Sequence, residues 1–282
     1  MAIRVLTETL KTIEDYKVIN PYYNELFDIL SEILILREEY RHIMNGMNFP
    51  LDDRLVAKKL AGGLPLLDFS HGKFDFTPAK EYFLRLLEIA ERRAPGETEE
   101  FAQQIRNGVI DFEKMIRRSF NSGSDEEFTL DVDIDFDEEA FDLIELFMEE
   151  SLRPFLEDFA EKYSDIITNS GWDEGYCPVC GKEPKIGEIK DDEEGRFLFC
   201  NQCGFEWRYN HIKCPFCGNE EQQTLAYFAV EGDEKYRVDV CNLCKRYVKI
   251  VDFRGSGGKA NLDVEDIATL HLDMLASEEG YD

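Results

Sequence analysis

The sequence has 282 residues, of which 43% are hydrophobic and 12% aromatic, so it can bury a sizeable core and is not a disordered chain. Its formal net charge is −28, from 60 acidic and 32 basic residues, and this charge repels the phosphate backbone of nucleic acids. The first residues lack the apolar run and cleavage site of a signal peptide, and Glu32 and Arg37 interrupt the most apolar stretch. We therefore expect a cytoplasmic protein that has no membrane span and binds no nucleic acid.

The first part of the chain, residues 1–168, is predicted to be a helical domain. Residues 22–45 place leucine and isoleucine at helical spacing with charged residues between them. A second helix is expected over residues 51–60, where the pair Gly62-Gly63 ends it.

Three more helices are predicted before residue 168. Thr77 is a plausible N-cap, and Pro78 at the first helical position opens the first of them. The other two are expected over residues 98–120 and 137–167. Five or six helices with short connections predict an antiparallel helical bundle.

Residues 124–139 form an acidic segment that superficially resembles a calcium loop. Aspartates alternate with apolar residues from Asp131 to Asp137, but an EF-hand loop that began at Asp131 would need glycine where Phe136 stands. We therefore expect an extended segment with a polar face and no calcium site.

The composition changes near residues 168–171, from helical patterns to cysteines, aromatics and short strand-like runs, and this change predicts a domain boundary. The tail returns to a helical pattern. Asp263 is a plausible N-cap, and we expect a C-terminal helix over residues 263–279 that packs back on the protein.

All the cysteines of the chain lie after residue 176, in four Cys-x-x-Cys pairs. Two residues between cysteines allow both sulfurs of a tight turn to point at one ion. Glycine after the second cysteine allows the positive φ of such a turn, but Lys245 takes this place in the last pair, at a cost in backbone strain. The four pairs are Cys177/Cys180, Cys200/Cys203, Cys214/Cys217 and Cys241/Cys244.

An internal repeat predicts how the pairs combine. We call each Cys-x-x-Cys turn a knuckle. Residues 172–212 and 213–258 each follow the order knuckle, strand, charged turn, strand, knuckle, which is the layout of a zinc ribbon or rubredoxin-like unit. We therefore predict an α+β protein: an N-terminal helical bundle, two tandem four-cysteine units and a C-terminal helix. One ion is assigned to Cys177, Cys180, Cys200 and Cys203, and the other to Cys214, Cys217, Cys241 and Cys244. A crossed pairing of the knuckles is the alternative, which the duplication disfavours.

The spacing favours metal binding over a redox dithiol, because a thioredoxin-like pair would open a helix in a βαβ unit. Four sulfur ligands suit either iron or zinc and leave no position for a substrate, so we predict structural ions and no catalytic residues. The four histidines are scattered, and His211, between the two units, is interpreted as a surface residue.

The motifs of the C-terminal half resemble those of the formate dehydrogenase accessory (formation) protein family. The likeness rests on CPVCG at residue 177, LFCNQCGFEWRYNHIKCPFCG at residues 198–218, the run VCNLCKRYVKIVD and the acidic closing helix. It covers residues 170–282 well. The first 165 residues match mainly in helical character and in the segment GGLPLLDFS.

This resemblance implies a cytoplasmic, non-enzymatic maturation factor or chaperone that binds the catalytic subunit of a formate dehydrogenase, with knuckles that can carry iron. His211 stands where the family pattern has arginine, which puts details of partner contact in doubt. A rubredoxin-like electron-transfer partner is the main alternative. A zinc-ribbon nucleic-acid-binding protein is disfavoured by the charge and by the lack of a basic stripe, and no flavin, nicotinamide or thiol site supports a free-standing redox enzyme.

Overall fold

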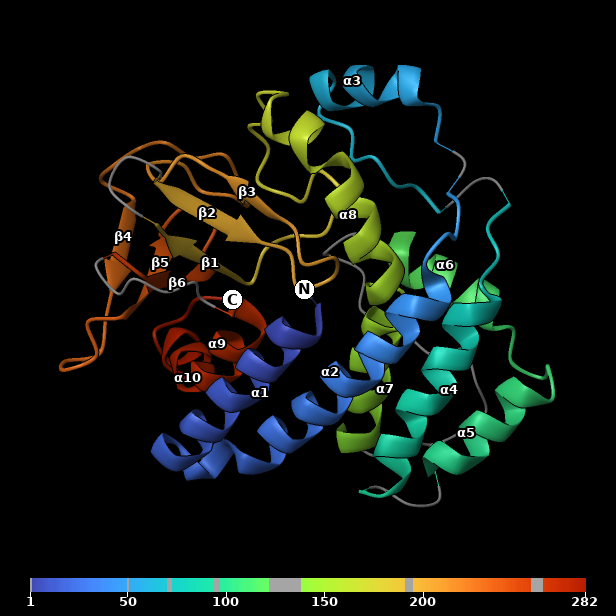
Figure 1. Ribbon diagram of the computed structural model, residues 1–282. Helices are drawn as coiled ribbons and strands as arrows, with labels where there is room; N and C mark the ends of the chain where they lie inside the picture. Colours follow the sequence, from blue (N-terminus) through green and yellow to red (C-terminus); the bar gives the residue numbers. More distant parts are fainter. Residues whose placement is uncertain are drawn as a thin grey trace.

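The computed structural model describes residues 2–49, 51–69, 73–93, 97–121, 138–190, 195–254 and 261–282. A helical half is followed by one sheet and two closing helices, and the sheet stands beside the bundle (Figure 1). The predicted α+β class is confirmed. The helices of the first half are α1 (Ala2–Ile19), α2 (Asn24–Met44), α3 (Asp53–Ala61), α4 (Thr77–Glu91), α5 (Glu97–Arg106), α6 (Phe112–Asn121), α7 (Glu138–Glu150) and α8 (Arg153–Thr168), with a short 3₁₀ turn at Pro21–Tyr23.

The prediction of a single helix over residues 98–120 is wrong, because the chain forms α5 and α6 with a loop between them. Gly108 has a φ of +72°, a left-handed conformation that ends a helix and that glycine adopts without strain. The Asp111 carboxylate then accepts a hydrogen bond from the backbone N–H of Lys114 at 3.1 Å and caps the start of α6.

The long helix expected over residues 137–167 is also divided, into α7 and α8. Pro154 has no backbone N–H to donate to the carbonyl of Glu150, so the helix cannot continue through it. The Ser151 hydroxyl instead donates to the carbonyl of Met148 at 2.7 Å. Residues 124–137 of the acidic segment, which was predicted to be extended, lie outside the described residues.

The strands form one six-stranded sheet in the order β3-β2-β1-β6-β5-β4. Both predicted hairpins are present, as antiparallel pairs β1–β2 and β4–β5, but the sequence did not indicate β3 or β6. A parallel pairing of β1 with β6, with Ile186 opposite Lys249, joins the two repeats into one sheet. The strands are β1 (Ile186–Ile189), β2 (Arg196–Phe199), β3 (Glu206–Arg208), β4 (Leu225–Phe228), β5 (Tyr236–Cys241) and β6 (Tyr247–Asp252).

Two short helices, α9 (Leu262–Ala268) and α10 (Leu270–Glu278), stand where one helix over 263–279 was expected. Asn261 rather than Asp263 is the N-cap, and its side chain accepts from the backbone N–H of Val264. The chain turns at Thr269, whose hydroxyl donates to the carbonyl of Glu265 at 2.7 Å. Both helices pack on one face of the sheet, where Leu262 and Leu272 join a cluster with residues of β5.

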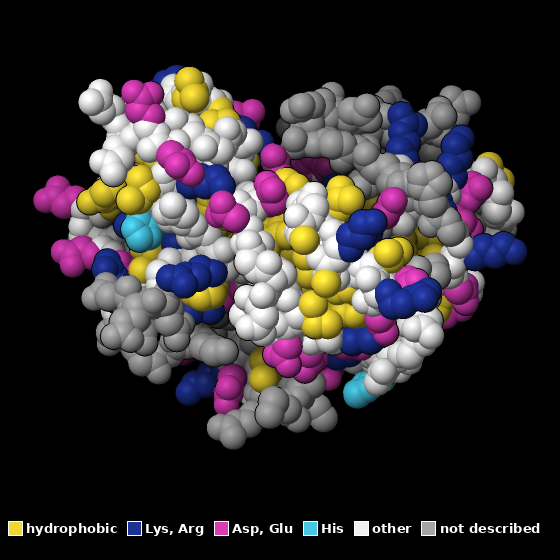
Figure 2. Space-filling model, turned by 90° about the horizontal axis from the view of Figure 1, so that it is seen from above, with side chains coloured by type: hydrophobic (Ala, Val, Ile, Leu, Met, Phe, Trp, Pro, Cys, Tyr) yellow, Lys and Arg dark blue, Asp and Glu magenta, His cyan; other side chains and the backbone are white. Residues whose placement is uncertain are grey.

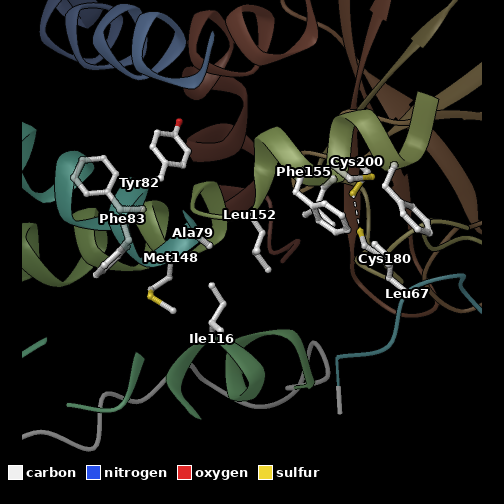
Figure 3. Packing of buried hydrophobic residues seen from close by; sticks show 14 of the residues in the cluster. Leu67, Ala79, Tyr82, Phe83, Ile116, Met148, Leu152, Phe155, Cys180 and Cys200 are labelled. Atoms are coloured by element: carbon white, nitrogen blue, oxygen red, sulfur yellow. Dashed lines mark hydrogen bonds between the residues drawn. The ribbon is translucent and has the colours of Figure 1, made fainter. Parts of the chain in front are cut away.

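The main hydrophobic core runs without a break from the bundle into the cysteine-rich half. Figure 3 shows Tyr82 and Phe83 of α4, then Leu152 and Phe155 at the start of α8, and beyond them Cys180 with its neighbours. The first cysteine group therefore belongs to the same core as the helices.

The surface mixes both kinds of charge despite the net charge of −28. Seen from above, hydrophobic side chains gather near the centre of the face, and Lys and Arg side chains lie on both lobes among the acidic ones (Figure 2). No helix among the described residues is both long and apolar enough to cross a bilayer.

Candidate metal centres

The first cysteine group lies where the bundle meets the sheet. The sulfurs of Cys177 and Cys203 are 3.4 Å apart, as are those of Cys180 and Cys200, and all four lie within 4.8 Å of one another. A disulfide would need about 2.05 Å, whereas a tetrahedral ion with bonds of about 2.3 Å separates its sulfurs by about 3.8 Å. The four thiols could therefore hold one metal ion after a small expansion.

The second group is built in the same way beside strand β5. The Sγ atoms of Cys214 and Cys244 are 3.7 Å apart, and those of Cys217 and Cys241 are 3.8 Å apart. These separations already fit a tetrahedral ion. Both groups contain the four cysteines that the sequence repeat predicts, so the chain has two four-cysteine groups that could each hold a metal ion.

All four knuckles share one turn. In the first, the backbone N–H of Gly181 donates to the carbonyl of Cys177 at 2.9 Å, and Gly181 has a φ of +80°. In the fourth, Lys245 donates in the same way to Cys241 at 2.8 Å and has a φ of +63°. Lys245 is the single non-glycine residue with a positive φ among the described residues, as expected from its place in the motif.

The two groups differ in burial. Cys177 and Cys200 are 0% exposed, whereas Cys217 is exposed and Cys244 is half-buried. Burial raises the pKa of the Cys177 and Cys203 thiols well above the ordinary value, whereas hydrogen bonds from the neighbouring thiols lower the pKa of Cys200. One thiolate is therefore stabilised by the group itself, and a full set of four needs a cation to compensate the charge. In the second group burial opposes ionisation, but the backbone N–H groups of Cys244 and Leu243 lower the pKa of Cys241 to about 7.

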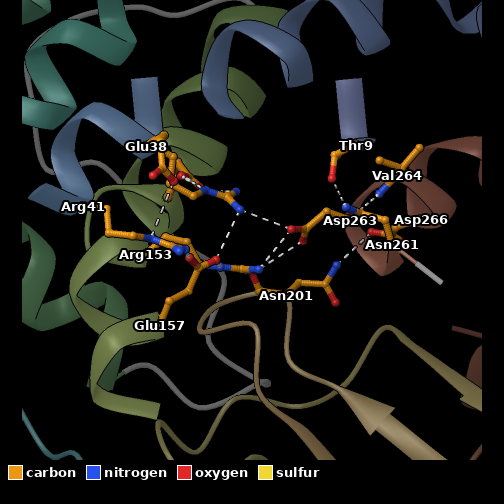
Figure 4. Close-up of polar contacts among 12 residues, drawn as sticks. Thr9, Glu38, Arg41, Arg153, Glu157, Asn201, Asn261, Asp263, Val264 and Asp266 are labelled. Atoms are coloured by element: carbon orange, nitrogen blue, oxygen red, sulfur yellow. Dashed lines mark hydrogen bonds and ion pairs between the residues drawn. The ribbon is translucent and has the colours of Figure 1, made fainter. Parts of the chain in front are cut away.

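A buried ion network anchors the first centre to the bundle. Arg153 at the start of α8 donates to the backbone carbonyl of Asn201, which lies between Cys200 and Cys203 (Figure 4). The same guanidinium binds Glu157 at 2.7 Å and Asp263 of α9 at 3.1 Å. One arginine thus connects a knuckle, the bundle and the C-terminal helix.

The network extends into the bundle through Arg37 of α2. Its guanidinium binds both oxygens of Glu150, each at 2.7 Å, and contacts Asp263 at 3.2 Å. The hydroxyl of Tyr82 donates to the same Glu150 carboxylate at 2.7 Å. Sequence reasoning missed this network, since its members are far apart in the chain and follow no motif.

Trp207, which carries part of the family likeness, has a structural position. Its ring is buried in the main core, and its Nε1 donates to the backbone carbonyl of Glu174 at 3.2 Å. A Cβ at Gly175 would lie 1.8 Å from the Pro215 carbonyl oxygen, so glycine is required there. The loop before the first knuckle therefore packs directly on the third knuckle, Cys214–Cys217.

No described histidine joins either cysteine group. His211 is exposed in the linker between the two halves of the sheet, in agreement with its interpretation as a surface residue. His42 is also exposed, His271 is half-buried, and His71 lies outside the described residues.

Glu188 on β1 should make stability depend on pH. Burial and the neighbouring Glu206 carboxylate raise the pKa of Glu188 to about 7, although Lys190 at 3.0 Å lowers it in part. The folded state therefore keeps a proton that the unfolded chain releases near pH 4.5, so this stabilisation is complete below that pH and lost as the pH rises through 7. We expect Glu188→Gln to flatten the stability curve between pH 5 and 7. Urea unfolding at each pH would measure it; an unchanged slope would contradict the assignment.

Comparisons with known proteins agree with the motifs. Residues 176–211 match the family model described as FdhE, central domain, and residues 212–282 match FdhE, C-terminal domain. A protein FdhE homolog of Aquifex aeolicus is 31% identical over 264 residues, which cover 93% of this chain and 87% of that protein. This chain belongs to the FdhE family. The predicted likeness to formate dehydrogenase accessory proteins is confirmed.

A sequence match and a structural match, both from Pseudomonas aeruginosa, extend the comparison. An FdhE homolog is 39% identical over 116 residues, which cover 37% of this chain and 36% of that protein. The crystal structure of the FdhE protein from Pseudomonas aeruginosa has a TM-score of 0.61, covering 97% of this chain and 90% of that one at 19% identity. At this identity the match supports the fold alone, and it extends the likeness to the helical half.

Proposed function

We propose that this FdhE-family protein is a non-enzymatic accessory factor that matures a formate dehydrogenase by binding its catalytic subunit. The observation that carries the proposal is membership of the family, with a relative matched over 93% of the chain. The composition of the two four-cysteine groups supports a role without catalysis, since four sulfurs around an ion leave no position for a substrate.

The eight cysteines are the proposed metal ligands, four to each ion, with iron or zinc as the metal. The sulfur separations of 3.4 to 3.8 Å support tetrahedral ligation, and both metals accept four thiolates. Burial of the first group supports a structural role there. Metal analysis of the purified protein should give two ions per chain.

A rubredoxin-like electron-transfer role is a second candidate for the second centre alone. Exposure of Cys217 supports it, because a partner could approach this sulfur, whereas the first centre is buried. The protein purified without oxygen would then be red on oxidation, with ferric-thiolate absorption. A colourless protein with two zinc ions per chain would exclude this candidate.

The client is tested by co-purification. A tagged copy of the chain should retain the catalytic subunit of the host's formate dehydrogenase, and deletion of the gene should abolish formate oxidation without lowering the amount of that subunit. Normal formate oxidation in the deletion strain would refute the proposed function. The same pull-down with an unrelated protein that carries a four-cysteine metal site and a similar charge controls for non-specific capture.

The domain division remains a proposal: a helical domain at 1–168, four-cysteine units at 172–212 and 213–258, and a C-terminal segment at 263–279. The end of α8 at Thr168 supports the first boundary. The family models, which meet between residues 211 and 212, support the division between the two units.

A further inference from the structure

A cavity of about 200 Å³ lies on the face of the sheet opposite α9 and α10. Its floor includes Tyr227 of β4 and Arg237 and Asp239 of β5, and its wall is the linker and knuckle from His211 to Phe216. On β5 the alternate residues Tyr236 and Val238 face the helices, so Arg237 and Asp239 point to the other side. Cys214 and Cys241 of the second cysteine group line one side of this cavity, whereas none of the described residues of the buried ion network lines it.

The cavity is basic in a chain of strongly negative charge. Arg196, Lys213, Arg237 and Arg246 line it, and Asp239 is the single carboxylate among the described residues that do so. Lys213 and Arg246 have partners outside the lining, since Lys213 pairs with Asp173 at 2.8 Å and Arg246 binds Glu183 at 2.7 Å.

Two guanidinium groups are left with one carboxylate. Asp239 pairs with Arg196 at 3.1 Å and with Arg237 at 2.8 Å. Among the residues that line the cavity, the two arginines therefore exceed their shared carboxylate by one positive charge, and Arg196 and Asp239 are largely shielded from water, at 3% and 15% exposure. A second anion between the two arginines would balance this charge.

Arg196 is held as a rigid donor. Its side chain is 3% exposed, and its Nη2 donates to the backbone carbonyls of Asn210 and Lys213 at 2.6 and 2.7 Å. Its Nε, also buried, has no hydrogen-bond partner among the described residues. A buried N–H without a partner is costly, so this atom marks the place where a ligand oxygen would be stabilised.

The positive charge is not explained by the thiolates of the second centre alone. Arg246 is the arginine that interacts electrostatically with these thiolates, because it lies near Cys244. Its guanidinium stacks on the ring of Phe216 at 3.9 Å. Arg196 and Arg237 instead bind Asp239, and their closest ion pairs among the described residues are with this carboxylate.

We propose that this cavity binds a small oxyanion, a carboxylate or a phosphate, between Arg196 and Arg237. Guanidinium groups recognise planar or tetrahedral oxyanions through their N–H donors, and here Nη1 of Arg196 and Nη2 of Arg237 both donate to Oδ2 of Asp239, at 3.1 and 3.3 Å. Cys214 and Cys241 also line the cavity, so the bound anion lies against the second centre.

Isothermal titration calorimetry of the metal-loaded full chain tests the site, with acetate and inorganic phosphate as separate probes and chloride at the same ionic strength as the reference. We expect one site per chain for at least one probe, and the probe that binds identifies the ligand class. Arg237→Gln should weaken it by about tenfold or more. Arg54→Gln, which removes an 89% exposed arginine on α3, is the matched control and should bind as the parent does.

Asp239→Asn gives an effect of opposite sign. It removes the internal carboxylate that competes for both arginines, so the probe should bind about tenfold more tightly and restore thermal stability lost by the variant. Several results would overturn the proposal: no binding beyond that of chloride, equal weakening in the Arg54 and Arg237 variants, or weaker binding after Asp239→Asn. Weaker binding after Asp239→Asn would show that Arg237 and Asp239 only support the fold.

Discussion

We expect Cys177→Ser to destabilise the whole chain by several kcal/mol, including helices far from the cysteines. Binding of a metal by four thiolates is coupled to folding and is worth ~10 kcal/mol or more in small structural sites. Cys177 is 0% exposed and lies in the same core as Phe155 and the bundle helices, so a damaged centre also loosens their packing. Urea unfolding followed by far-ultraviolet circular dichroism, with metal analysis, would measure both effects.

Cys217→Ser is the matched comparison, since it removes the same atom from the second centre. Cys217 is exposed, and its centre lies outside the main core apart from the neighbouring Phe216. We expect Cys217→Ser to weaken the binding of one metal ion and to leave the unfolding of the bundle almost unchanged. Equal losses of stability in both variants, or a bundle that keeps its stability after Cys177→Ser, would contradict the burial argument.

The cysteine groups could be predicted from the sequence because their geometry is local. A Cys-x-x-Cys turn fixes two sulfurs within four residues, and a hairpin brings the second pair to the first. The glycine positions follow from the same turn, and so does the positive φ of Lys245. The repeat then fixes which pairs combine.

The rest depends on contacts between distant segments. Strand β3 has three residues, too few to show a periodicity, and the parallel pairing of β1 with β6 joins residues about 60 positions apart. Proline, glycine and threonine divided three expected helices, although the apolar pattern continued through each break. Helical periodicity reports which face is buried and not whether the axis is continuous.

The two metal centres differ for a tertiary reason as well. Both repeats supply Cys-x-x-Cys knuckles, but the cysteines of the first belong to the main core with α8, where Arg153 binds the carbonyl of Asn201, and those of the second do not. The second faces solvent at Cys217 and the basic cavity at Cys214. The fold thus gives one sequence motif two environments, one suited to stability and one open to ligands and partners.

Arg153→Met should be as damaging as loss of a buried ligand. Arg153 is 2% exposed, and its replacement leaves the half-buried Asp263 and Glu157 with less positive charge and the Asn201 carbonyl without its donor. Breaking a buried ion network by removing one partner costs about 3–5 kcal/mol. We expect a loss of this size in urea unfolding, together with faster hydrogen exchange in α9 and in the knuckle at Cys200.

Arg85→Met is the control, because Arg85 is 51% exposed and, among the described residues, forms its ion pair with the neighbouring Glu88 within α4. Exposed pairs of this kind contribute about 0–1 kcal/mol. Adding Asp263→Asn to Arg153→Met removes part of the negative charge that has lost its partner. The double variant should therefore lose less unfolding free energy than the sum of the two single losses. Additive losses would mean that Arg153 acts through packing alone, and the bundle would then be held to the metal-binding half by its apolar core without this network.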